Sequence, residues 1–196
     1  MKTILFIDGR NFIDKIRFAI DPGRKREIDF STYDFDGLIN QALADVKIDR
    51  KLFYLGRLIK HPETTKKSED LIEKLRKLKT HLERQGFEVI ITGRVRGHLE
   101  KCSMGHETLT FKEKGVDVKI AVDLITLAYD RELKTAVIGS SDSDLQPAIA
   151  ELKKRDIERI YLGFEAIPNK GLTFTTNHTI LIRNSEVLKF IGKSLF

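Results

Sequence analysis

The sequence has very little cysteine and no long apolar segment. Cys102 is the only cysteine among its 196 residues, so no disulfide can form within the chain and a reducing compartment is expected. No apolar stretch approaches the roughly 18 residues that a membrane-spanning helix needs. The apolar run in residues 3–7 is too short for a secretory signal and meets Asp8. These absences predict a cytoplasmic protein with no membrane segment.

Signatures of several ligand-binding classes are also missing. A dinucleotide-binding turn needs several glycines after the first strand, whereas residues 8–12 contain only Gly9. The haloacid-dehalogenase phosphatases use a second aspartate two positions after the first, and that position here is Arg10. A conceivable zinc set lacks a paired Cys-x-x-Cys and consists of His98, Cys102, His106 and Glu107. We therefore interpret that last segment as a polar loop near a substrate groove.

The charge balance is basic. The formal net charge is +6 and the pI is about 9.3, which is compatible with a polyanionic partner. Most of the basic residues in 74–79 are interpreted as an exposed helix face. Arg94 and Arg96 follow a strand-like run, and Lys114 begins a helical pattern. These three cations are the candidates for binding the phosphates of a nucleic acid.

Short apolar runs predict the strands of the fold. They are rich in Ile, Val, Phe and Tyr and lack polar alternation, which is typical of strands covered on both faces. The runs cover residues 3–7, 51–56, 87–93, 135–140 and 159–164, with a late strand at 178–182.

Helical patterns alternate with these runs. They cover residues 66–86, 114–130 and 143–156, and a last helix is predicted with its cap at Asn184 or Ser185. Alternating strands and helices favour parallel pairing through right-handed crossovers. The predicted fold is therefore an α/β three-layer sandwich with a central, mainly parallel sheet.

We expect one domain over residues 1–196. Irregular insertions cover about 21–35 and 94–112, and the second of these is predicted to be a functional loop or a small edge hairpin. The C-terminal strand and helix occupy about 178–195.

Four aspartates are predicted to meet at the carboxyl ends of the strands. Asp8 follows the first strand, Asp142 and Asp144 follow the run at 135–140, and Asp117 opens a helix. Asp8 or Asp144 alone could be a helix cap. Four converging carboxylates would repel one another, and a divalent cation relieves that repulsion. Carboxylate oxygens suit Mg²⁺ or Mn²⁺.

Such a centre is suited to phosphodiester cleavage. A divalent cation lowers the pKa of water and neutralises charge on the leaving oxygen. Asn11, three residues beyond Asp8, could hold a phosphate or a water without adding negative charge. Asp8, Asn11, Asp117, Asp142 and Asp144 are thus the candidate catalytic residues.

Three segments, in this order, resemble the motif blocks of the NYN domain. They are "FIDGRN" (6–11), "KGVDVKIAVDL" (114–124) and "VIGSSDSDLQPAI" (137–149). The NYN domain is a branch of the PIN-like ribonuclease superfamily that includes the LabA-like proteins. The resemblance implies a PIN-like Rossmannoid sandwich and metal-dependent cleavage of RNA. It implies a metal set of Asp8, Asp117, Asp142 and Asp144, with Asn11 as a polar companion and Asp123 in a supporting position.

The third block departs from the usual family pattern, Ser-Gly-Asp-Ser-Asp-Phe. Ser141 replaces the glycine and adds a side chain at a tight turn, and Leu145 replaces the phenylalanine. Neither change removes a carboxylate. Ser141 is therefore placed with Asp123 among the supporting residues.

The sequence predicts an Mg²⁺- or Mn²⁺-dependent ribonuclease. The alternative is an RNA-binding or regulatory module that keeps the acidic pocket but has little or no activity. A homodimer or a protein partner could complete the substrate channel. The RNA target and the choice between endo and exo cleavage are left open.

Overall fold

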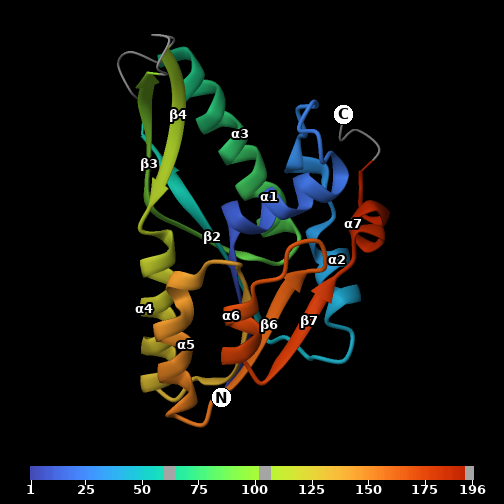
Figure 1. Ribbon diagram of the computed structural model, residues 1–196, viewed down its shortest axis with the longest axis vertical. Helices are drawn as coiled ribbons and strands as arrows, with labels where there is room; N and C mark the ends of the chain where they lie inside the picture. Colours follow the sequence, from blue (N-terminus) through green and yellow to red (C-terminus); the bar gives the residue numbers. More distant parts are fainter. Residues whose placement is uncertain (60–64, 102–106, 193–196) are drawn as a thin grey trace.

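The computed structural model describes residues 1–59, 65–101 and 107–192, without the side chains of residues 65–67, 96–101 and 107–109. These residues form a seven-stranded sheet with the order β4-β3-β2-β1-β5-β6-β7 (Figure 1). All neighbouring strands are parallel except β3 and β4. The strands are β1 (Lys2–Asp8), β2 (Arg50–Leu58), β3 (Glu88–Lys101), β4 (Glu107–Lys114), β5 (Leu133–Gly139), β6 (Glu158–Phe164) and β7 (His178–Ile182).

Helices connect the parallel strands. The α-helices are α1 (Gly9–Ile20), α2 (Phe35–Ala42), α3 (Thr65–Arg84), α4 (Val116–Tyr129), α5 (Gln146–Lys153), α6 (Lys170–Thr175) and α7 (Asn184–Lys189). Short 3₁₀ turns lie at η1 (Phe30–Thr32) and η3 (Ser143–Leu145).

The sheet separates two hydrophobic cores, and β1 contributes to both. Leu5 and Ile7 pack in a core with α1, α2, α3 and α7. Ile4 and Phe6 pack in a second core with α4, α5 and α6. Successive side chains of a strand point to opposite faces, so an unbroken apolar run supplies both cores. This confirms the predicted α/β sandwich with a central, mainly parallel sheet.

Some helices differ from the prediction. α1, α2 and α6 are absent from the predicted set. The predicted helix at 143–156 begins as η3 and ends at Lys153. The predicted cap of the last helix is wrong, because Arg183 is the N-cap of α7. The Glu186 carboxylate accepts a hydrogen bond from the Arg183 backbone N–H at 2.8 Å, which fixes the helix start there.

The two irregular segments take different forms. Residues 94–101 and 107–112 belong to the antiparallel strands β3 and β4 at the edge of the sheet. Residues 21–35 contain η1 and then lead into α2. The Tyr33 hydroxyl donates a hydrogen bond to the Val187 carbonyl at 2.9 Å, which ties this second segment to α7.

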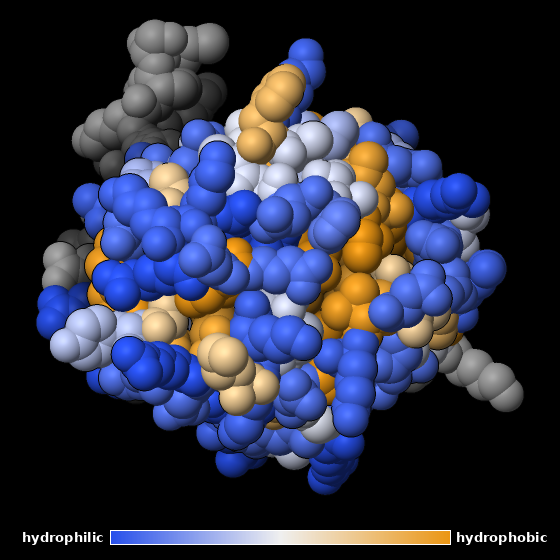
Figure 2. Space-filling model, turned by 90° about the horizontal axis from the view of Figure 1, so that it is seen from below, coloured by the Kyte–Doolittle hydropathy of each residue, from blue (hydrophilic) through white to orange (hydrophobic). Residues whose placement is uncertain are grey.

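In the described segments, no helix combines the length and the apolar character that crossing a membrane requires. Figure 2 shows the end of the molecule where β1 begins, and its surface is mainly hydrophilic with separate hydrophobic patches. The candidate site lies at the other end of the strands.

Candidate metal centre

Asp8 lies where β1 passes into α1. Its Oδ1 atom accepts a hydrogen bond from the Asn11 backbone N–H at 3.1 Å, so the residue is the N-cap of α1. β1 pairs with β2 on one side and with β5 on the other. The connections leave these strands in opposite directions, and such a switch point is where open α/β sheets bind ligands.

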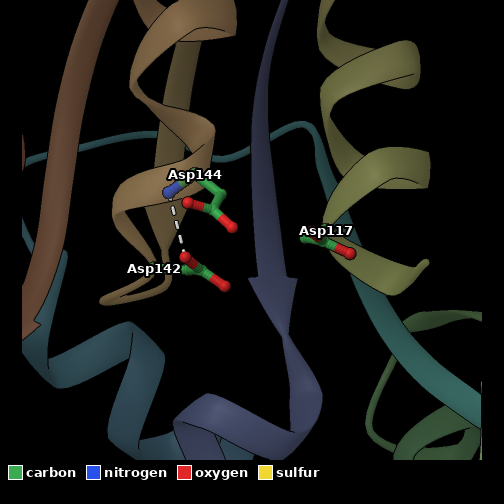
Figure 3. Close-up of side chains that lie close together, drawn as sticks. All are labelled: Asp117, Asp142 and Asp144. Carbon is green, nitrogen blue, oxygen red and sulfur yellow. Dashed lines mark hydrogen bonds between the residues drawn. The ribbon is translucent and has the colours of Figure 1, made fainter. Parts of the chain in front are cut away.

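Asp142 and Asp144 lie just beyond β5, next to the end of β1. The backbone N–H of Asp144 donates to Asp142 Oδ1 at 2.9 Å, as the dashed line in Figure 3 marks. This bond makes Asp142 the N-cap of η3. It fixes one carboxylate oxygen of Asp142 and sets the two side chains next to each other.

Asp117 lies in the first turn of α4, and two glycines set that turn. Gly115, the N-cap of α4, has φ of 86°, and Gly93 in β3 has φ of 60°. A Cβ atom on Gly93 would lie 2.5 Å from the Lys114 carbonyl oxygen. Only glycine permits this backbone conformation and this close approach, so the two residues let β4 turn sharply into α4.

The three carboxylates form one group. One oxygen each of Asp117, Asp142 and Asp144 lies within 4.8 Å of the others, and the three come from α4 and the turn before α5 (Figure 3). The part of the chain that the structure describes contains no second group of this kind. Three oxygen ligands at this spacing fit a hard divalent cation that keeps some of its waters.

Asp8 lies outside that group of three but in the same cavity. The cavity has a volume of about 700 Å³ and is lined by Asp8, Asn11 and all three clustered aspartates. Asp8 is only 7% exposed. Burial raises the pKa of its carboxyl, and the charges of Asp142 and Asp117 raise it further. The structure therefore brings the four predicted aspartates to one rim, with Asp8 at the buried side.

Asn11 and Ser141 join the two loops that carry these acids. The Ser141 backbone N–H donates to Asn11 Oδ1 at 3.0 Å, and Asn169 Nδ2 donates to the Ser141 carbonyl at 2.8 Å. The side-chain oxygen Oδ1 of Asn11 thus already accepts a hydrogen bond, and the Nδ2 group of the same side chain can donate to a ligand. Asn169, the N-cap of α6, was not among the predicted residues.

The serine hydroxyl that contacts the acids belongs to Ser140. It donates to Asp8 Oδ2 at 3.4 Å and accepts from the Asp142 backbone N–H at 3.1 Å. Ser141, the predicted supporting serine, acts instead through its backbone. Two adjacent serines offer no sequence signal that tells which one turns inward.

Asp123 is not among the residues that line the acidic cavity. Its carboxylate accepts hydrogen bonds from the Tyr54 hydroxyl at 2.9 Å and from Lys119. Burial raises the pKa of Tyr54 above its usual range, and the Asp123 charge adds to this effect. Asp123 thus anchors α4 to β2, which is compatible with the supporting position predicted for it.

Of the predicted phosphate-binding cations, the structure places one in the acidic cavity. Lys114 lines the acidic cavity. Arg94 pairs with Lys114 across the two strands and is exposed, but it does not line that cavity. The side chain of Arg96 lies outside the described residues. So do the side chains of the conceivable zinc set, His98, Cys102, His106 and Glu107.

Glu113 also lies in the cavity and is not among the residues predicted from the sequence. It is in β4, where the half-buried Phe111 and Glu113 alternate with the exposed Lys112 and Lys114, and all four residues line the cavity. Burial raises the pKa of its carboxyl to about 6, and the Asp8 charge adds to the rise. The period-two alternation of residues 111–114 is the signal that could have revealed it.

Replacement of Glu113 by glutamine is expected to change the pH dependence of stability. The carboxyl has a pKa of about 6 in the fold against 4.5 for an ordinary glutamate. The folded state therefore binds more protons between these values, and the free energy of unfolding falls as the pH rises through that window. Glu113→Gln removes this loss. In the presence of EDTA, its melting temperature should rise relative to wild type between pH 4 and pH 7, by the equivalent of about 1 kcal/mol.

Glu88→Gln is the matched control. Glu88 in β3 pairs with Arg50 at 2.7 Å, and this hydrogen bond lowers the pKa of Glu88. Its contribution to stability is present above the ordinary pKa of glutamate and is lost as the pH falls. Glu88→Gln should therefore melt below wild type at pH 7 and approach it in acid. Equal pH profiles for wild type and Glu113→Gln would contradict the burial of the Glu113 charge.

Comparison with known proteins identifies the family of this chain. A family model described as the NYN domain matches residues 2–182. The chain matches no curated protein. It is similar to the crystal structure of a protein of unknown function from Vibrio parahaemolyticus, with a TM-score of 0.56 and 14% identity over 92% of this chain and 93% of that one. That likeness shows the fold alone. The match to the family model extends from β1 to β7, and the chain therefore belongs to the NYN domain family, a branch of the PIN-like nucleases.

Proposed function

We propose that the chain is a ribonuclease that hydrolyses RNA phosphodiester bonds with the help of Mg²⁺ or Mn²⁺. The observation that carries the proposal is the group of three carboxylates, Asp117, Asp142 and Asp144, with oxygens within 4.8 Å of one another. Membership in a nuclease family supports it. A divalent cation bound there would lower the pKa of a water molecule and neutralise charge on the leaving oxygen.

The residues of the chain divide the remaining tasks. Asp8 is buried beside the three clustered acids and adds a further carboxylate to the cavity. Asn11 Nδ2 offers a neutral donor to a phosphate oxygen, and Lys114 offers a positive charge at the cavity wall. Asp142 is held by its bond to the Asp144 backbone, so its position does not depend on a ligand. This preorganisation favours in-line positioning of water and phosphate.

Removal of the metal tests the proposal directly. Labelled single-stranded RNA should be cleaved by the protein with Mn²⁺ or Mg²⁺ and left intact with excess EDTA, because four carboxylates cannot by themselves neutralise a phosphate. Adding back an excess of Mn²⁺ should restore cleavage. Cleavage that persists in EDTA would contradict the metal requirement. RNA that is bound but not cut with either metal would favour a binding or regulatory module instead.

A cytoplasmic location remains a prediction from the single cysteine. A homodimer or protein partner that completes the substrate channel likewise remains a prediction. The cleavage assay with the purified protein tests the nuclease activity separately from these two predictions.

A further inference from the structure

A second cavity adjoins the acidic one. It has a volume of about 780 Å³ and lies between α1, α3 and the strands β2, β3 and β4. We call it the α1/α3 groove. Its apolar wall includes Leu55, Leu58, Leu71, Leu75, Leu78 and Phe111.

The groove and the acidic cavity are continuous. Arg10, Asp14, Phe111 and Glu113 line both of them. A phosphate held beside the clustered aspartates would thus have an apolar recess next to it. A nucleic acid can place a phosphate in the first cavity and an adjoining base in the second without leaving the protein surface.

The lining of the groove suits a nucleobase. Phe111 is partly exposed in it and offers an aromatic face on which a base can stack. Arg10 Nη1 donates to the Phe111 carbonyl at 3.1 Å, which holds the arginine at the junction of the two cavities. An apolar wall with a few charged groups at its edge is the usual lining of a small-molecule pocket, and the volume is within the range of about 300–1,000 Å³ for such sites.

Charged residues also line the groove. Glu27, in the segment before η1, forms an ion pair with Lys74 of α3, and both residues line the groove. Arg17 lies with its guanidinium 5.5 Å from the centre of the Phe30 ring, which also lines it. The volume of about 780 Å³ suits one nucleotide better than a continuous strand.

We propose that the α1/α3 groove binds one unpaired base of the RNA next to the cleaved phosphate. The proposal rests on the proposed function and narrows its substrate to RNA that is single-stranded at that position. A base within a duplex is stacked and paired, so it cannot enter the groove without being taken out of the helix. Selection of unpaired RNA follows from this arrangement.

The experiment uses a fluorescent base analogue. A short unstructured RNA carries 2-aminopurine at one position at a time, and its fluorescence is measured on titration with the cleavage-defective variant Asp142→Asn. The chain contains no tryptophan, so the protein contributes little background. We expect strong quenching at one position only, and much weaker quenching when the same RNA is annealed to its complement.

Variants of the groove locate the quenching. In the same background, Phe111→Ala should abolish it and weaken RNA binding at least about fivefold, since it removes the stacking face. Phe174→Ala is the control, because Phe174 is 88% exposed on α6 and lies outside the groove. Leu71→Glu should repel the nucleotide from the wall. Ile72→Glu places the same charge at the next residue of α3, where it does not line the groove, and should leave quenching unchanged.

Either of the following results would overturn the inference, as would the absence of local quenching. One is equal quenching at every position or in the duplex. The other is a Leu71→Glu protein that quenches like Ile72→Glu, a comparison that holds even when Phe111→Ala fails to fold. The readout does not require cleavage, so failure of the groove and failure of the nuclease are seen in different assays. If the protein cleaves RNA with Mn²⁺ but shows no local quenching, the proposed nuclease activity is supported and the proposed base site is wrong.

Discussion

The Asp142→Asn protein is expected to cleave RNA at least about a hundredfold more slowly than wild type with Mn²⁺, while remaining folded. Asp142 contributes one of the three clustered carboxylates, and an amide is a much weaker ligand for a hard cation. The amide carbonyl can still accept the hydrogen bond from the Asp144 backbone N–H. Asparagine is as good an N-cap as aspartate, so η3 should keep its place.

The same substitution at another helix cap separates chemistry from folding. Asp34 caps α2 by accepting from the Gly37 backbone N–H at 2.8 Å, and it lies outside the acidic cavity. Asp34→Asn should cleave RNA at the wild-type rate. Cleavage rates with Mn²⁺ and melting curves of both variants provide the comparison. Comparable loss of activity in the two proteins would show that cap geometry, rather than the metal centre, limits cleavage.

The meeting of the acids could be predicted because it depends on topology. Asp8 and Asp142 follow strands whose apolar runs are unmistakable, and parallel strands bring their carboxyl ends to one rim whatever their exact lengths. The structure places β1 and β5 side by side, as that argument requires. The finer separation, with Asp8 buried and outside the group of three, depends on side-chain contacts that the sequence pattern does not contain.

The contribution of the hairpin could not be predicted in the same way. Residues 94–112 leave two interpretations open, a functional loop or an edge hairpin, and the alternation of residues 111–114 marks an inward face only if the hairpin forms. Once β4 pairs with β3, Glu113 turns towards Asp8 while Lys112 stays exposed. The position of Glu113 is therefore a consequence of long-range pairing.

The missing helices have two causes. α1 contains apolar residues at helical spacing, with Phe12, Ile13 and Ile16 buried, so the sequence does carry a signal for this helix. α6 is six residues long and buries only Leu172. A helix that short has no measurable periodicity, and its start depends on the Asn169 side chain, which accepts from the Leu172 backbone N–H at 3.0 Å.

The Asp8→Asn protein is expected to lose cleavage by at least about a hundredfold and to become more stable without metal. Burial and the neighbouring charges raise the pKa of Asp8, so the folded state holds its proton more tightly than the unfolded chain does. The free energy of unfolding of wild type therefore falls as the pH rises through the raised pKa, and a neutral amide avoids this loss. At pH 7 in EDTA the melting temperature should rise by about 2–4 °C, which corresponds to about 1 kcal/mol in a protein of this size.

The sign of that shift distinguishes a charge held for function from an ordinary helix cap. Asp29 caps η1, and the Ser31 backbone N–H lowers its pKa, so Asp29→Asn should melt below wild type at pH 7. Added Mn²⁺ should raise the melting temperature of wild type more than that of Asp8→Asn, because the metal offsets the repulsion that the variant already lacks. An active Asp8→Asn protein would remove Asp8 from the catalytic set. A less stable Asp8→Asn protein would show that Asp8 serves mainly as a structural helix cap. A bound cation is needed to explain the Asp8 carboxylate only if its charge destabilises the metal-free fold.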